Sequence, residues 1–167
     1  MAVTIGMLCI CIAGILLMLY AGVAFIQDKK YFTSAPKDIQ EAIQVHEERF
    51  KGAHALGWIL MILACVMIFG SVIYAAYDGI HKGFSFTQFF IRFLIMLDGY
   101  KIWDMIFLDW FLLTKSHFYQ HYYPETEGCE SFKHTGFNTK SQLLKLFVIF
   151  PLVSLVLAGI CMLIERI

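Results

Sequence analysis

Residues 86–113 read FTQFFIRFLIMLDGYKIWDMIFLDWFLL, and this stretch decides the predicted fold. It is long enough to cross a bilayer, because a helix rises about 1.5 Å per residue and about 20 apolar residues span the hydrocarbon core. Four charged side chains nevertheless lie in its interior: Asp98, Lys101, Asp104 and Asp109. A charge near the bilayer centre costs at least about 2.5 kcal/mol on insertion scales. We therefore expect these groups to face other helices, water or one another.

The four charges form a stripe if the whole stretch is an α-helix. At about 100° per residue, Asp98 and Asp109 lie within about 20° of each other, and Lys101 and Asp104 widen the polar arc to about 140°. Lys101 stands three residues from both Asp98 and Asp104, so it can pair with either, and one negative charge is left over among these three groups. Such a surplus is typical of a site for a proton, a cation or a small polar solute, and the alternative is an ion network that fixes helix packing or docks a partner.

Composition places the chain among membrane proteins. Hydrophobic residues make up 59% of the 167 and charged residues 16%, and the mean hydropathy of +0.69 is far from the balance of soluble proteins. The 13 basic and 13 acidic residues give a formal net charge of zero. Nothing in this balance suggests nucleic-acid binding, which would require a strong basic excess.

Four apolar runs predict the architecture. They cover about residues 3–27, 55–77, 86–113 and 143–164, with polar connections at 28–54 and 114–142. The predicted fold is an all-α integral membrane protein, a single domain over 1–167 with four transmembrane helices in an antiparallel bundle. The spacing of Ile39, Ile43, His46, Phe50 and His54 also predicts an amphipathic surface helix between the first two spans. Ser85 and Gln88 form a capping box that starts the third span.

Positive charges predict the orientation in a cell membrane. The connections 28–54 and 114–142, with the adjoining Lys145, hold nine lysines and arginines, whereas the opposite side holds three. Because lysine and arginine are enriched in cytoplasmic loops, both connections are predicted to be cytoplasmic and both termini outside. Cys129 would then be kept as a thiol by the reducing cytoplasm.

Histidines and acids in the two connections suggest a second chemistry. His117 and His121 stand at i and i+4, a spacing that places two imidazoles on one face of a helix. Further His and carboxylate ligands would suit iron or zinc. The candidate metal ligands are His117, His121, His46, Glu47, His54 and His134. The alternative is a solvated helical extension whose aromatic side chains meet lipid head groups.

Three functional hypotheses follow, and whether the chain is an enzyme is left open among them. The first is binding or translocation of a proton, cation or small polar solute at Asp98, Lys101, Asp104 and Asp109. The second is a metal-dependent membrane enzyme acting on a lipid-soluble substrate. The third is a non-catalytic subunit that docks a larger membrane partner. The expected partners are the lipid bilayer and either further copies of this chain or that larger protein, because 167 residues are few for a transporter acting alone.

Overall fold

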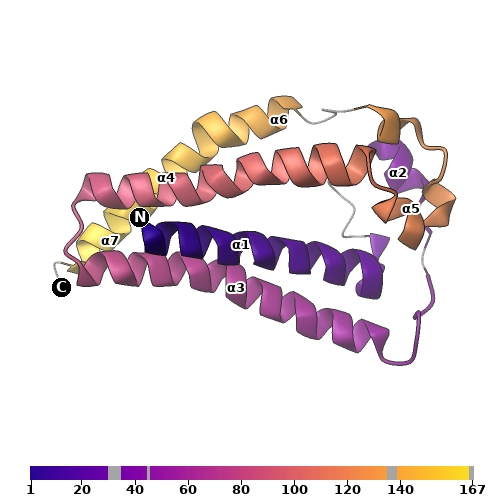
Figure 1. Ribbon diagram of the computed structural model, residues 1–167, viewed down its shortest axis with the longest axis horizontal. Coiled ribbons are helices and arrows are strands. Elements are labelled where there is room, and N and C mark those ends of the chain that lie inside the picture. Colours follow the sequence, from indigo (N-terminus) through magenta and orange to yellow (C-terminus); the bar gives the residue numbers. More distant parts are fainter. Residues whose placement is uncertain (30–34, 45, 135–138, 166–167) are drawn as a thin grey trace. The chain divides into compact units, whose positions relative to one another are not determined.

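The part of the chain that the structure describes is mostly helical. The computed structural model describes residues 1–29, 35–44, 46–134 and 139–165, and every regular element in these ranges is a helix. Three helical stretches, Ala2–Ile26, Ala53–His81 and Thr139–Glu165, are long and apolar enough to cross a membrane. They appear as long ribbons in Figure 1. The three stretches match the first, second and fourth predicted spans.

The long stretches are assembled from α-helical and wider π-helical pieces. The first consists of α1 (Ala2–Tyr20) and the π-helical segment η1 (Ala21–Ile26), and the second is the single helix α3 (Ala53–His81). The third comprises α6 (Thr139–Leu144), the π-helical η6 (Lys145–Ile149) and α7 (Phe150–Glu165). The charged stretch forms α4 (Phe86–Trp103) followed by the π-helical η3 (Asp104–Leu112), and it is not among the three apolar helices because of its charges.

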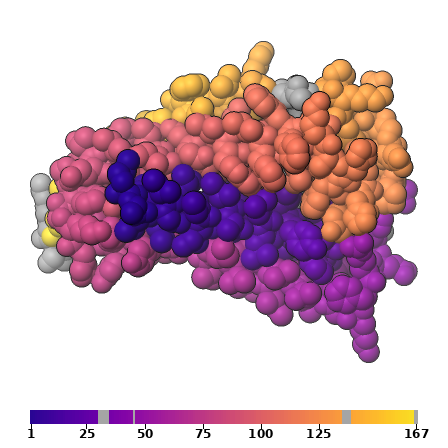
Figure 2. Space-filling model, viewed as in Figure 1, coloured from indigo at the N-terminus to yellow at the C-terminus, as the bar shows by residue number. Residues whose placement is uncertain are grey.

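A stripe of exposed apolar side chains runs along α3. Its members recur at intervals of three and four residues, and each is more than 60% exposed: Ile59, Ile62, Val66, Phe69 and Ile73. Helix α1, drawn in indigo in Figure 2, also contributes to the molecular surface, where Ile5 is 54% exposed. Large apolar residues exposed at this density suit contact with lipid chains rather than with water.

The chain divides into two compact units, which we describe separately. The first contains Met1–Gly14, Cys65–Trp103 and the described part of Asn138–Ile167. The second contains the described parts of Ile15–Ala64 and Asp104–Phe137, so it holds most of both polar connections. The division falls inside α1 and α3, and it separates α4 from η3.

The core of the first unit is formed mainly by α4 and α7. Phe89 and Phe93 of α4 stack with ring centroids 6.3 Å apart and pack with Ala158 and Cys161 of α7. Helix α3 approaches them closely at Gly79, where an added Cβ would lie 2.3 Å from a ring carbon of Phe89. A larger side chain at this position would therefore displace the Phe89 ring.

The start of α4 shows one of the two bonds of the predicted capping box. The backbone N–H of Ser85 donates to the side-chain oxygen of Gln88 at 2.8 Å, and the Ser85 hydroxyl donates to the same oxygen at 3.2 Å. Gly83, in the turn before α4, has φ of +61°, a left-handed conformation that glycine adopts without steric cost. Helix α4 thus begins where its sequence indicates.

The second unit has its own core, built from the end of the first span and both connections. It joins Val23 of η1 to the buried Ile39, Ile43, Tyr123 and Phe132. A smaller cluster contains Ala21, Ile26 and Met61. Gly57 of α3 allows this contact, since an added Cβ would lie 2.7 Å from a side-chain carbon of Ile26. The connections are therefore part of a packed structure.

Two predictions about helices in the connections are wrong. The surface helix is α2 (Lys37–Ala42), only six residues long, and the backbone is already extended at Ile43. Burial of Ile39 and Ile43 in the core explains their apolar spacing without a longer helix. The helix expected to carry both His117 and His121 is also interrupted, because the chain turns at residues 115–117 and α5 (Phe118–Tyr122) contains only His121. Two 3₁₀-helices follow, η4 (Pro124–Thr126) and η5 (Glu130–Lys133).

Candidate functional site

A groove in the second unit brings one carboxylate next to apolar side chains. It has a volume of about 370 Å³ and is lined by Asp104 and by seven uncharged residues: Ile15, Met18, Leu19, Gly22, Val23, Met61 and Leu108. This volume is within the range of pockets that hold small organic molecules, which are likewise mostly apolar with few polar groups. The groove is therefore a candidate ligand site.

Two π-helical segments contribute to this groove. Gly22 and Val23 belong to η1, and Asp104 and Leu108 belong to η3. A π-helix forms i→i+5 hydrogen bonds, is rare, and occurs frequently at functional sites. Because its turns are wider than those of an α-helix, it changes the direction in which later side chains point. Here the change begins at Asp104 itself.

The π-helix also alters the predicted stripe. The separation of about 20° between Asp98 and Asp109 assumed α-helical geometry along the whole stretch, and η3 does not have that geometry. Asp98 and Lys101 belong to the first unit, whereas Asp104 and Asp109 belong to the second. Lys101 is only 5% exposed, and Oδ1 of Asp98 is buried without a hydrogen bond from any described residue.

The carboxylates of η3 act electrostatically on Tyr119 in α5. Burial, followed by the negative charges of Asp109 and Asp104, raises the pKa of the Tyr119 hydroxyl well above its usual value. The phenol is therefore neutral at all physiological pH values. The same negative potential favours a cation near η3.

The predicted metal ligands contact different partners. Nδ1 of His54 lies 3.4 Å from Glu48, and Nε2 of His46 lies 2.8 Å from Glu125. His117 precedes α5 and the His121 ring packs edge-on against Tyr122, with ring centroids 4.9 Å apart. His134 and Glu47 are in the described ranges as well. Within those ranges, no three His, Cys, Asp or Glu side chains are grouped to hold a metal ion. The iron or zinc hypothesis therefore gains no support.

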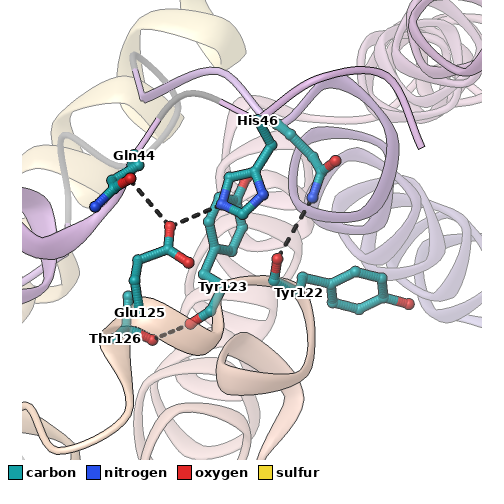
Figure 3. Close-up of polar contacts among 7 residues, drawn as sticks. Gln44, His46, Tyr122, Tyr123, Glu125 and Thr126 are labelled. Atoms are coloured by element: carbon teal, nitrogen blue, oxygen red, sulfur yellow. Dashed lines mark hydrogen bonds and ion pairs between the residues drawn. The ribbon is translucent and has the colours of Figure 1, made fainter.

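Glu125 joins the two connections, as Figure 3 shows. Its Oε1 accepts hydrogen bonds from the backbone N–H of Gln44 at 3.0 Å and from His46 at 2.8 Å. The His46 ring packs edge-on against Tyr123, which is fully buried. Burial alone would raise the pKa of the Glu125 carboxyl, but the hydrogen bonds from His46 and Gln44 bring it below the usual value.

A second contact between the connections surrounds Cys129. Its thiol donates to the backbone carbonyl of Asp38 at 3.8 Å, and the Asp38 carboxylate accepts from Ser131. Burial and the nearby Asp38 carboxylate raise the pKa of the Cys129 thiol. All five cysteines of the chain are free: Cys9, Cys11, Cys65, Cys129 and Cys161.

The sequence alone identifies Cys129 only as a thiol of a cytoplasmic connection, and it does not single out Glu125, Gln44 or Ser131 as contact residues. Their partners are distant in sequence, as in the contact of Ser131 with Asp38. One signal was present: Tyr123 precedes Pro124, and an aromatic residue before a turn-forming proline is an apt anchor for a loop core. No protein-family model, curated protein or solved structure matches the chain.

Proposed function

We propose that this chain crosses the membrane four times, with α4 and η3 forming the third crossing. Helix α4 alone has 18 residues and so extends about 27 Å, close to the thickness of the hydrocarbon core. The π-helical η3 adds nine residues in the same run. Burial of Lys101 supports this assignment, because a buried charge lies away from lipid.

Both connections are proposed to be cytoplasmic. Their contacts with each other through Glu125 and Asp38 support a common side of the membrane. The excess of lysine and arginine in the connections supports the cytoplasmic side in particular.

The function we propose is the binding or translocation of a cationic solute, with the Asp104 groove as its binding site. The observation that supports the proposal is the lining of this groove, in which, among the described residues, the Asp104 carboxylate is the one charged group beside seven uncharged residues. A carboxylate has about four lone-pair positions, so Asp104 can accept from a solute in addition to its protein partners. Asp109 is a second carboxylate of η3, and together with Asp104 it adds to the larger effect of burial in raising the pKa of Tyr119.

The lining favours an organic cation over a hydrated metal ion. A Ca²⁺ or Mg²⁺ ion requires about six oxygen ligands or retained waters, which the apolar walls of this groove do not offer. An amine or quaternary ammonium on an apolar body matches both parts of the lining. Its charge would face Asp104, and its body would contact Met18, Met61 and Leu108.

Binding of octylammonium and tetraphenylphosphonium to the full-length protein in a neutral detergent tests the proposal. Asp104→Asn should weaken the binding of both cations at least tenfold, because the neutral amide removes their counter-charge. Ile15→Trp should weaken tetraphenylphosphonium more than octylammonium, because it narrows the groove for the bulkier ion. Glu127→Gln, which changes an exposed acid outside the groove, is the matched control and should have no effect. Equal affinities of wild type and Asp104→Asn would disprove the site.

A further inference from the structure

A second groove, in the first unit, lies beside the buried arginine of α4. It has a volume of about 210 Å³ and is lined by Met1, Thr4, Phe84, Gln88, Ile91, Arg92 and Ile95. Arg92 is 3% exposed, which is rare for an arginine and requires partners. The proposed cation site at Asp104 does not involve this groove, so the two can be tested separately.

Arg92 is held in place by three contacts. Its Nη1 donates to the backbone carbonyl of Ala75 at 2.7 Å and lies 2.8 Å from Oδ2 of Asp78. The guanidinium also stacks over the ring of Phe84, with 4.2 Å between Cζ and the ring centroid. A side chain fixed in this way is already oriented before any ligand binds.

The charge around Arg92 is not balanced by Asp78. The same carboxylate also pairs with Lys82, whose Nζ lies 2.6 Å from Oδ1. Two cations and one anion leave a surplus of one positive charge, and Arg92, the more buried cation, lines the groove. Nε of Arg92 is buried and bonds to no described residue. Glu165 lies near Gly83, but it is exposed and forms no ion pair with either cation.

Gln88 adds a second donor at the groove. Its side-chain oxygen accepts from Ser85 in the capping box, so its NH₂ group is the part left to donate elsewhere. A buried cation and an amide NH₂ together recognise an acceptor group, above all an anionic oxygen. The remaining walls include Ile91, Ile95 and Phe84, which are apolar.

We infer that this groove binds the anionic head group of an amphiphile, a carboxylate or phosphate ester carried on an apolar chain. The volume admits a head group and a few methylene groups, which is less than a whole lipid. The rest of the chain would follow exposed apolar residues such as Ile91, which is 46% exposed. Arg92 is apt for this role, because its planar guanidinium binds carboxylates and phosphates in a fixed geometry.

Ligand binding to the full-length, delipidated protein in a neutral detergent tests this inference, with native mass spectrometry and thermal shift as readouts. Dioctanoyl phosphatidate and decanoate distinguish the two head groups, and stable binding of either one supports the inference. Dioctanoylglycerol has the same chains as the phosphatidate without its phosphate, and inorganic phosphate has no chain. Dioctanoylglycerol and inorganic phosphate should each bind at least tenfold more weakly than dioctanoyl phosphatidate. Equal binding of dioctanoylglycerol, or of inorganic phosphate, would overturn the inference.

Two variants test the site without removing the buried ion pair. Gln88→Glu keeps the oxygen that caps Ser85 but replaces the NH₂ donor by a negative charge, so anion binding should fall at least tenfold. Ile95→Trp fills the groove and should also weaken anion binding at least tenfold. Ile102→Trp, at an exposed position of α4 outside the groove, should leave anion binding unchanged. Wild-type affinity in both Gln88→Glu and Ile95→Trp would overturn the inference.

Discussion

Asp38 and Ser131 form a double hydrogen bond between the two polar connections. One carboxylate oxygen accepts from the Ser131 hydroxyl at 2.6 Å, and the other accepts from its backbone N–H at 3.0 Å. The residues are 93 positions apart, so the contact fixes α2 against η5 in the folded chain. Burial would raise the pKa of Asp38, but these bonds lower it below the usual value.

Ser131→Ala should destabilise the second unit by about 1 to 2 kcal/mol, because it removes a hydroxyl donor from a charged acceptor. The backbone bond to Asp38 remains, which limits the loss. Hydrogen exchange of the amides in 37–42 and 130–133 should report the change more directly than a global melt. Glu130→Gln, an exposed neighbour, is the control. Unchanged exchange in Ser131→Ala would mean that the hydroxyl bond contributes nothing.

The contact of Glu125 with His46 predicts a dependence of stability on pH. The pKa of Glu125 is lower in the folded than in the unfolded chain, where a glutamate titrates near about 4.3. Its contribution is therefore fully present above about pH 4.3 and disappears as the pH falls through the folded-state pKa. At pH 7 the wild type should have a higher melting temperature than Glu125→Gln, and this difference in melting temperature should vanish in strong acid. A difference that is the same at every pH would show that charge at Glu125 is not involved.

The assignment of the connections to the cytoplasm predicts how Cys129 reacts. An impermeant maleimide should label it only after the membrane is opened, in a variant whose other four cysteines are replaced by alanine. Labelling in intact cells would contradict the proposed orientation.

Once accessible, Cys129 should react slowly at neutral pH, because burial and the Asp38 carboxylate raise its pKa. Asp38→Asn removes the charge and should speed the reaction. Ser131→Ala loosens the same contact but keeps the charge, so it separates electrostatics from exposure. Equal acceleration in both variants would show that access alone limits the rate.

The long apolar helices could be predicted from sequence because burial in lipid depends on length and composition, and both are visible in the chain. The capping box at Ser85 and Gln88 was also predictable, since its contacts span three residues. The π-helical segments η1 and η3 were not, because no composition distinguishes them from α-helix. Their presence redirects Asp109 and builds the Asp104 groove.

The connections show a different limit. The spacing of Ile39 and Ile43 identified a buried face correctly, but their partners Tyr123 and Phe132 come from about 80 to 90 residues later. Without those partners, an apolar spacing of four residues indicates a helix. When Tyr123 and Phe132 are present as partners, the short helix α2 and the extended segment after it bury Ile39 and Ile43. Within the described ranges the candidate metal ligands are not grouped for the same reason, since His46 pairs with the distant Glu125.

Removal of the Lys101 charge should destabilise the protein. Lys101 is 5% exposed and stands three residues from both Asp98 and Asp104, so by this spacing Lys101→Met should leave two carboxylates without a counter-charge, at a cost of about 3 to 5 kcal/mol. The triple variant Asp98→Asn, Lys101→Met and Asp104→Asn removes the charges together and should melt close to wild type. Thermal melts in detergent compare the three proteins. If Lys101→Met alone has the melting temperature of the wild type, the Lys101 charge is not paired in the fold.

The ion pair between Arg92 and Asp78 allows the most direct separation of stability from binding. Arg92 and Asp78 side chains are only 3% and 12% exposed, so Arg92→Gln leaves the Asp78 carboxylate largely buried with Lys82 as its remaining partner. We expect a loss of about 3 to 5 kcal/mol for Arg92→Gln, and a much smaller loss when Asp78→Asn is added, because no charge is then left unpaired in the core. Lys82→Gln is the matched control, since its side chain is 54% exposed and such pairs contribute about 1 kcal/mol or less. The double variant should fold and yet fail to bind dioctanoyl phosphatidate. If it instead binds as wild type does, Arg92 serves the packing of α4 against α3 and the head group lies elsewhere.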